Sequence, residues 1–202
     1  MEYIKISVGN GKMQGLSSIN TNTMTNLFCL NQCKFKDDCY SKRHINRFRN
    51  NANAWELNSD KLSSQLINYD LLPKFFNTKV IRFHSHGELI NDTHLINFIN
   101  ICIKNPDITF TLWTKRNDLI KKYFDEYYNT GSYRDKPDNL ILIFSNSKFN
   151  APMKKIPLYF DKTFNVITKD SDIKPNCIGK CKDCMICYTK NSKETQIIEV
   201  LK

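Results

Sequence analysis

The chain has 202 residues, eight cysteines and a formal net charge of +10. This length is enough for one domain with a buried core, and it exceeds the usual length of small secreted proteins that depend on disulfides. The first residues lack the apolar run of a signal peptide, and the longest nearly apolar run, residues 95–103, is too short to span a bilayer. We therefore expect a cytoplasmic protein without a membrane partner, in a reducing compartment where clustered cysteines indicate metal binding.

The positive charge raises the question of a nucleic-acid partner. Basic residues are scattered along the chain, except that six of them lie within residues 34–49. Such a stretch either contacts phosphates or forms a solvated helix face, and we favour the solvated face. Nucleic acid is therefore a possible partner rather than the expected one.

The N-terminal part leads to a cysteine loop at residues 26–40. Residues 3–8 alternate as a strand does, residues 9–11 supply a turn, and the polar segment 15–25 is prone to β-structure. Three cysteines of the loop have the spacing C-x3-C-x5-C: Cys29, Cys33 and Cys39.

Two helices are expected after this loop. Residues 40–53 are compatible with a polar helix. Ser59 predicts the N-cap of a second helix, which Pro73 ends or kinks.

Alternating strands and helices fill the rest of residues 59–150. Strands are predicted at residues 79–84, 107–113 and 139–144, and helices begin near Asp92 and Asn117. Short strands are also expected at residues 158–168 and 195–201. Strand–helix–strand order with short links predicts an α/β fold with a parallel sheet, and without a low-complexity linker we expect one domain over residues 1–202.

Polar residues follow three of these strands. Because ligands of parallel α/β sheets bind at the carboxyl ends of strands, we expect a site there. His84 and His86 alternate along an extended segment, so a functional role and a core role are equally open for them; His44 and His94 carry no signal. The candidate cofactor-binding residues are His84, His86, Gly87, Glu88, Lys115 and Ser145.

A second cysteine group lies within residues 170–190 and has the spacing C-x3-C-x2-C-x2-C. These intervals are those of a bacterial ferredoxin run in reverse order, whereas structural zinc sites usually combine two short knuckles separated by a dozen or more residues. We favour metal over disulfides or unrelated thiols, and an iron–sulfur cluster over zinc. The remaining cysteine, Cys102, lies on the apolar face of a predicted helix and is expected to be a buried thiol. The group consists of Cys177, Cys181, Cys184 and Cys187.

A cysteine trio ahead of βα units, with Gly87-Glu88 just after the next strand, resembles the radical SAM superfamily. That resemblance implies a partial (βα) barrel and a [4Fe-4S] cluster with one iron open to S-adenosylmethionine (SAM), whose amino group would meet Glu88. Two features depart from the superfamily pattern. The usual trio is C-x3-C-x2-C, three residues shorter than here, and the segment before Glu88 has only one glycine.

More specifically, the chain resembles the small phage and plasmid family called gene product eighty-eight. The matching pieces, in order along the chain, are residues 9–13, 39–40, 81–88, 110–115 and 181–188. The biochemical role of that family is poorly defined, so this resemblance implies no particular substrate.

We therefore expect an α/β protein with a partial, radical-SAM-like (βα) barrel and a cysteine-rich C-terminal segment, carrying one or two [4Fe-4S] clusters. If it is an enzyme, it would cleave SAM reductively and need an electron donor, with a substrate that the sequence does not indicate. Two alternatives stay open. One is a non-catalytic iron–sulfur or zinc module for electron transfer or nucleic-acid binding, and the other is an iron–sulfur fold that has lost SAM.

Overall fold

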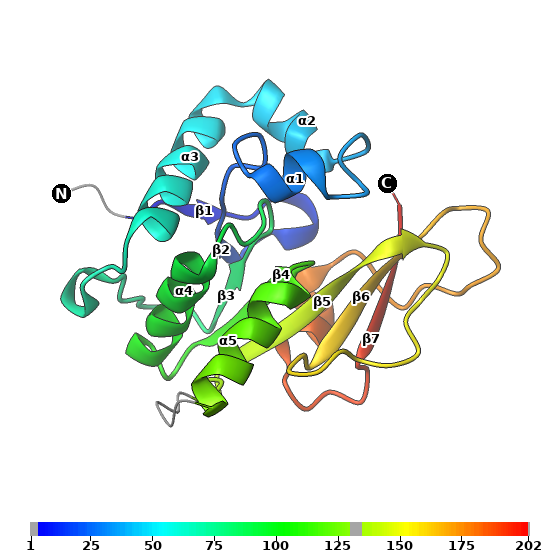
Figure 1. Ribbon diagram of the computed structural model, residues 1–202. Helices are drawn as coiled ribbons and strands as arrows, with labels where there is room; N and C mark the ends of the chain where they lie inside the picture. Colours follow the sequence, from blue (N-terminus) through cyan, green and yellow to red (C-terminus); the bar gives the residue numbers. More distant parts are fainter. Residues whose placement is uncertain (1–3, 130–134, 202) are drawn as a thin grey trace.

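The computed structural model describes residues 4–129 and 135–201 (Figure 1). The strands are β1 (Ile6–Val8), β2 (Ser17–Ile19), β3 (Val80–Phe83), β4 (Thr109–Thr114), β5 (Leu140–Phe149), β6 (Lys162–Ile167) and β7 (Gln196–Val200). The α-helices are α1 (Leu27–Asn31), α2 (Tyr40–Arg47), α3 (Arg49–Ser64), α4 (Asp92–Lys104), α5 (Asn117–Asn129) and α6 (Cys181–Cys184). The 3-10 helices are η1 (Gly11–Met13), η2 (Tyr69–Leu71) and η3 (Ile186–Tyr188).

All seven strands form one mixed sheet in the order in which they occur along the chain. β1 runs antiparallel to β2, and every later neighbour pair is parallel. The predicted α/β class and the parallel sheet are therefore confirmed. Within the described residues no pairing joins β1 to β7, so the sheet is open.

Alternation along the central strands divides the core into two faces. On β5, Leu140 and Leu142 pack with the helices, whereas Ile141 and Ile143 pack against η1, α6 and η3 on the opposite face. All four are fully buried, as expected for a strand covered on both sides. Figure 1 shows α4 and α5 in front of the sheet and the C-terminal segment behind it.

The predicted elements of the central region are confirmed with small shifts of their ends. α4 begins after Asn91, whose side chain accepts a hydrogen bond from the backbone N–H of His94 at 3.0 Å, as an N-cap residue does. Cys102 is fully buried in this helix, as predicted. The strand predicted at residues 3–8 corresponds to β1, which spans Ile6–Val8. Its first predicted residue, Tyr3, lies outside the described residues.

The predicted N-cap at Ser59 is wrong. Ser59 lies inside α3, where its hydroxyl donates to the backbone oxygen of Trp55 at 2.9 Å and accepts from the backbone N–H of Asn22, also at 2.9 Å. A buried serine in a helix can satisfy its hydroxyl with the carbonyl four residues earlier, so its presence did not mark a helix start.

The predicted end of β5 is also wrong. The strand continues to Phe149, and Ser145 pairs with Phe164 of β6 within the sheet. The register becomes irregular between Ser145 and Phe149. Ser145 therefore lies inside a strand and not in the loop beyond it.

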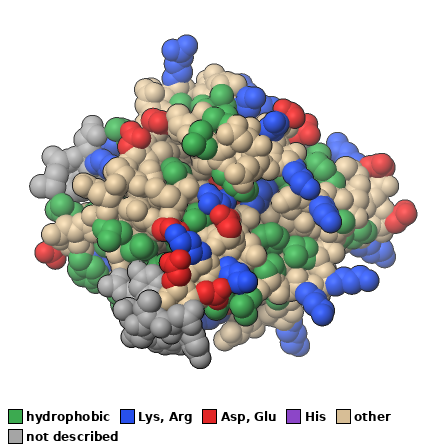
Figure 2. Space-filling model, viewed as in Figure 1, with side chains coloured by type: hydrophobic (Ala, Val, Ile, Leu, Met, Phe, Trp, Pro, Cys, Tyr) green, Lys and Arg blue, Asp and Glu red, His purple; other side chains and the backbone are tan. Residues whose placement is uncertain are grey.

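Charged side chains are dispersed over the face of the molecule that Figure 2 shows. On the face seen in Figure 2, Lys and Arg side chains are spread among acidic and apolar ones and do not gather into a single patch. None of the helices in the described part of the chain combines the length and the apolar character needed to cross a membrane.

Candidate functional site

The first cysteine group lies in the loop that connects β2 to α2. Cys29 lies in α1, where the Asn26 side chain caps the first turn by accepting hydrogen bonds from the backbone N–H groups of Phe28 and Cys29, at 3.0 and 3.4 Å. Cys33 follows α1, and Cys39 is the N-cap residue of α2. All three thiols are half-buried.

The surroundings of Cys29 disfavour a free thiolate. Burial raises the pKa of Cys29 well above its ordinary value, and the Glu88 carboxylate and the Cys33 and Cys39 thiols raise it further, whereas Lys115 opposes the rise. The three thiols and Glu88 therefore lie close enough to interact electrostatically. A cation bound among them would remove the cost of ionising them.

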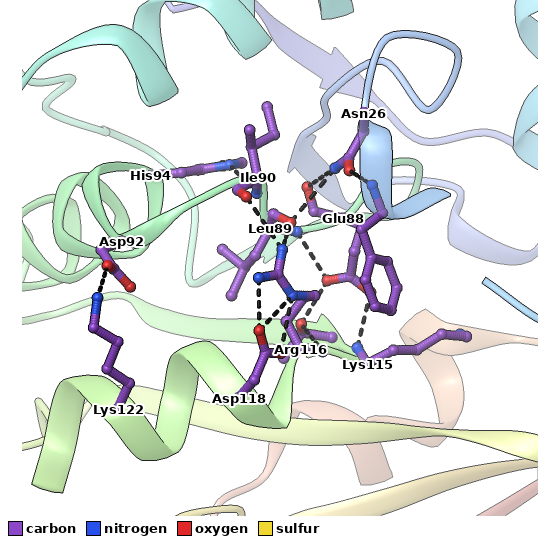
Figure 3. Close-up of polar contacts among 12 residues, drawn as sticks. Asn26, Glu88, Leu89, Ile90, Asp92, His94, Lys115, Arg116, Asp118 and Lys122 are labelled. Atoms are coloured by element: carbon purple, nitrogen blue, oxygen red, sulfur yellow. Dashed lines mark hydrogen bonds and ion pairs between the residues drawn. The ribbon is translucent and has the colours of Figure 1, made fainter. Parts of the chain in front are cut away.

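Glu88 lies in the segment after β3 and is 5% exposed. Its Oε1 accepts hydrogen bonds from the Thr114 hydroxyl at 2.5 Å and the Leu89 backbone N–H at 2.8 Å, and its Oε2 accepts one from the Lys115 backbone N–H at 2.8 Å (Figure 3). Burial raises the pKa of Glu88, while Lys115 and these hydrogen bonds oppose the rise. The carboxylate is thus fixed between the ends of β3 and β4.

Three of the predicted site residues come together beside the first cysteine group. The Lys115 Nζ donates to the Ser145 hydroxyl at 2.6 Å, and Glu88 accepts from the Lys115 backbone. Asn26 connects the same segment to the cysteine loop, because its Nδ2 donates to the backbone oxygen of Glu88 at 3.0 Å. The expected convergence at the strand ends therefore exists for Glu88 and Lys115, and Ser145 joins them from inside β5.

Gly87 is required by a close approach of two loops. Its φ of +112° is strained for any side chain, and a Cβ atom there would lie 2.2 Å from the Thr21 Oγ1 and within 2.9 Å of the Thr21 backbone nitrogen and oxygen. Thr21 N donates to His86 O at 3.2 Å, which holds the loops together. The glycine thus lets the segment after β3 pack on the segment after β2.

The two predicted histidines have different surroundings. The His84 ring is 3% exposed and packs against His94 and Phe98 of α4, on the helix side of the sheet. His86 is half-buried and lines a large cavity on the other face. Burial lowers the pKa of each to about 3. His86, rather than His84, is therefore placed to meet a ligand.

The C-terminal cysteine group lies on the face of the sheet opposite the helices. The backbone N–H of Cys177 bonds to the oxygen of Ile198 in β7 at 3.0 Å, and the other three cysteines lie in α6 and η3. All four cysteines line one small cavity of about 20 Å³. Its wall also includes three cations and two aromatic residues that carry polar groups: Lys12, Arg82, Lys180, Trp113 and Tyr188.

Hydrogen-bond donors without acceptors surround this small cavity. The Arg82 guanidinium lies 3.8 Å from the centroid of the Trp113 ring. The Trp113 Nε1–H and the Tyr188 hydroxyl are buried and have no hydrogen-bond partner among the described residues. Burial raises the pKa of Cys187 to about 12, and the nearby Arg82 opposes the rise. The wall therefore offers positive charge and N–H and O–H groups to an anionic acceptor.

In residues 4–129 and 135–201, no group of three or more His, Cys, Asp or Glu side chains has an arrangement that could hold a metal ion. The four C-terminal thiols share a cavity without forming such a group. Their chemistry fits a thiolate-bound metal, since bound iron or zinc would stabilise the thiolates and an anionic cluster would accept the unpartnered hydrogen bonds.

A cavity of about 650 Å³ lies between the two ends of the sheet. Residues of β1, β2 and β3 and residues of β6 and β7 all line it, so the sheet curls around it. Lys12 and Arg82 line both this cavity and the small one. It therefore adjoins the C-terminal cysteine group, and Tyr40 on its wall directly follows Cys39 of the first group.

Several residues of these sites carried no signal in the sequence. Trp113, Tyr188 and Lys12 adjoin the C-terminal cysteines only because the chain folds back on the sheet. His44 was assigned no role, yet it lines the large cavity. Arg82 offered one usable signal: a cation between Ile81 and Phe83 in an otherwise apolar strand faces the opposite side from its neighbours.

The family model described as Gene product 88 matches residues 7–193. The chain therefore belongs to this family. Comparison with curated proteins and comparison with solved structures gave no match. The matched range includes both cysteine groups, so these groups lie inside the region that defines the family match.

Proposed function

We propose that this protein binds iron–sulfur clusters through its two cysteine groups, on a partial (βα) barrel. Cys177, Cys181, Cys184 and Cys187 would complete all four corners of a [4Fe-4S] cluster, and Cys29, Cys33 and Cys39 would hold a second cluster with one iron open to SAM. When bound, these groups would supply the one-electron chemistry of reductive SAM cleavage.

One observation carries the proposal: four thiols line one cavity whose wall contains donors without acceptors. A [4Fe-4S]2+ core with four thiolates has a net charge of about −2, and its sulfides and thiolates accept hydrogen bonds. Arg82 would balance part of that charge. The Trp113 Nε1–H and Tyr188 hydroxyl, both buried without partners, would gain acceptors, which removes the cost of leaving such groups unpaired.

The strand order supports the partial barrel. Six parallel strands, β2 to β7, follow one another in sequence order, whereas a doubly wound sheet reverses direction at a switch point. Both ends of the sheet line the same cavity, as they do when a sheet curls toward closure. The first cysteine group follows β2, the first parallel strand.

The geometry around Glu88 supports a role in holding the SAM amino group. Within residues 4–129 and 135–201, its Oε1 accepts two hydrogen bonds but its Oε2 accepts only one, from the Lys115 backbone. A carboxylate oxygen can accept more than one, so Oε2 retains capacity for an ammonium group. Thr114 and Leu89 would hold the carboxylate in place while it binds.

A structural zinc site is the second candidate for the C-terminal group. The small cavity of about 20 Å³ has room for about one water-sized sphere as it stands, which suits one ion better than a cluster of eight atoms. Zinc bound by four thiolates would fix the C-terminal segment against the sheet without redox chemistry. The unpartnered donors favour the cluster, and the cavity size favours zinc.

Anaerobic purification followed by metal, sulfide and absorption analysis decides between them. We expect brown protein with broad visible absorption, and iron and sulfide in equal amounts. Cys184→Ser should remove about half of both, while Cys102→Ala, at the buried thiol of α4, should leave both unchanged. Colourless protein with one zinc per chain would overturn the iron–sulfur proposal.

SAM binding is tested on the reduced protein by electron paramagnetic resonance. Added SAM should perturb the signal of the cluster at Cys29, Cys33 and Cys39 and leave the C-terminal signal alone. Glu88→Gln should weaken that response without loss of iron. If both signals ignore SAM, the protein is an electron-transfer or structural iron–sulfur protein.

A further inference from the structure

The 650 Å³ cavity has the size of a small-molecule site. Its lining includes both charged and aromatic side chains. Four cations and two acids line it: Lys5, Lys12, Arg43, Arg82, Asp38 and Glu199. Lys12 and Glu199 neutralise each other in an ion pair of 2.5 Å. Three cations and one acid are left, so the wall attracts an anion.

Arg82 is the cation with the most unused capacity. Of its five N–H donors, one contacts the His84 backbone oxygen at 3.3 Å and one the Met13 sulfur at 3.5 Å, a weak acceptor. No carboxylate in the described residues forms an ion pair with it. The Trp113 ring fixes the guanidinium in place by stacking. A preformed guanidinium with free donors is suited to bind the oxygens of a phosphate.

Tyr40 provides a flat apolar surface on the same cavity. Its hydroxyl donates to the backbone oxygen of Ser85, yet the residue is 55% exposed, so the ring is anchored at one end and accessible along its face. His86 lies 5.0 Å from the Tyr40 ring, between centroids, and stacks on Trp55 at 4.4 Å. This aromatic wall cannot collapse into the cavity, because Trp55 is buried and bonded to Ser7.

We propose that this cavity binds a nucleoside 5′-phosphate, with the base against Tyr40 and the phosphate toward Arg82 and Arg43. Aromatic side chains stack on bases of any sequence, and guanidinium groups bind phosphate oxygens in pairs. The binding rests on side chains that are in place without metal. It therefore goes beyond the proposed clusters, and metal content measured on the same samples separates its outcome from theirs.

Isothermal titration of the purified full chain with the four common nucleoside 5′-monophosphates tests the proposal. We expect at least one to bind, the matching nucleoside to bind about tenfold or more weakly, and inorganic phosphate more weakly still, because each lacks one of the two contacts. No binding by any of the four at millimolar concentration would overturn the proposal, and so would phosphate binding as tightly as the nucleotide.

Matched variants locate the ligand. Arg43 and Arg47 are both exposed on α2, but only Arg43 lines the cavity. Arg43→Gln should weaken nucleotide binding about tenfold and leave nucleoside binding unchanged, whereas Arg47→Gln should change neither. Tyr40→Leu should weaken both ligands. Equal affinities for Arg43→Gln and Arg47→Gln would place the ligand elsewhere and overturn the assignment. Metal and sulfide content measured on the same samples keeps this outcome separate from the fate of the clusters.

Discussion

The two cysteine groups differ in what surrounds them. Cys29, Cys33 and Cys39 lie in a loop at the carboxyl ends of the first parallel strands, beside the buried carboxylate of Glu88. The four C-terminal cysteines lie against the opposite face of the sheet from the helices, beside Arg82 and Lys12 and under two aromatic residues with unpartnered donors.

This difference shows that the two cysteine groups have unlike electrostatic surroundings, which suit different tasks in the proposed function. Three thiols next to a carboxylate leave room for an outside ligand, and the carboxylate can hold its cationic end. Four thiols next to a guanidinium would, in the proposed function, supply all the protein ligands of a cluster, and the guanidinium would favour added negative charge. The following four changes separate the two groups experimentally.

Gly87→Ala should have the largest effect and should fall on the first group. The new Cβ would meet Thr21 at 2.2 Å in a backbone with φ +112°, so we expect a loss of unfolding free energy of about 3 kcal/mol or more. Gly11→Ala is the matched control: φ is +53° there, but nothing lies within 4 Å of the Cβ position, and about 1 kcal/mol is expected. Urea denaturation measures both. Equal losses would show that the approach to Thr21 does not constrain the loop.

Acid should destabilise the fold through His84, which follows β3 and packs on α4. Burial lowers the pKa of His84 to about 3 from 6.5. The folded state therefore keeps His84 neutral, and its stability is complete above pH 6.5 and falls as the unfolded state gains a proton below it. At pH 5 the loss is about 2 kcal/mol from this one group. No histidine lines the small cavity.

His84→Asn tests this dependence, because asparagine tolerates the positive φ of 61° at this position and does not titrate. Between pH 7 and pH 5 the variant should lose about 2 kcal/mol less unfolding free energy than the unchanged chain, as measured by urea denaturation at both pH values. An identical loss of unfolding free energy in the two proteins would show that His84 is not the source of the acid dependence.

Arg82→Gln should act on the C-terminal group. A guanidinium near an anionic cluster stabilises the reduced, more negative state by roughly 1–2 kcal/mol at an effective dielectric constant of about 20. Its removal should lower the reduction potential of that cluster by about 60 mV, which corresponds to a tenfold change for one electron. Lys12→Gln should change it less, since Glu199 already neutralises Lys12 at 2.5 Å. Potentiometry followed by electron paramagnetic resonance would measure both, and a larger effect of Lys12→Gln would reverse the assignment.

Cys102→Ala should have the smallest effect and touch neither group. Cys102 is fully buried in α4 among apolar residues, so removing its sulfur should cost about 1 kcal/mol of unfolding free energy. Iron and sulfide should stay at the level of the unchanged chain. Loss of either would reveal a metal ligand that belongs to neither group.

The local pattern of the sequence was sufficient for the α/β class and for most elements. Each strand–helix unit from residue 79 to residue 129 has its own apolar periodicity, and α4 also has the Asn91 cap. Both signals depend on neighbours in the chain. The prediction at Ser59 was wrong because a serine inside a helix can also satisfy its hydroxyl with a hydrogen bond. The local sequence does not distinguish such a serine from one at the start of a helix. The prediction that the strand ends before Ser145 was wrong because pairing with β6 extends β5 through polar residues.

Some residues of the candidate site could likewise be predicted from the sequence, and others could not. Glu88 and Lys115 could be predicted together, because parallel strands bring their carboxyl ends to one edge, whereas Ser145 contacts Lys115 from inside β5. Arg82 and Trp113 could not be assigned to the C-terminal cysteines from the sequence. They meet only because residues 177–188 fold back across the sheet, and no local pattern encodes a contact between segments so far apart.

Arg82 lines both the small cavity and the large one. Its single charge acts on whatever occupies either side. An anion bound in the large cavity would occupy donors of the guanidinium and so reduce the stabilisation that Arg82 gives to a reduced cluster. By thermodynamic reciprocity, reduction of the cluster would lower the affinity for the anion by the same factor. One half-buried arginine would thus couple release of the ligand to reduction of the cluster.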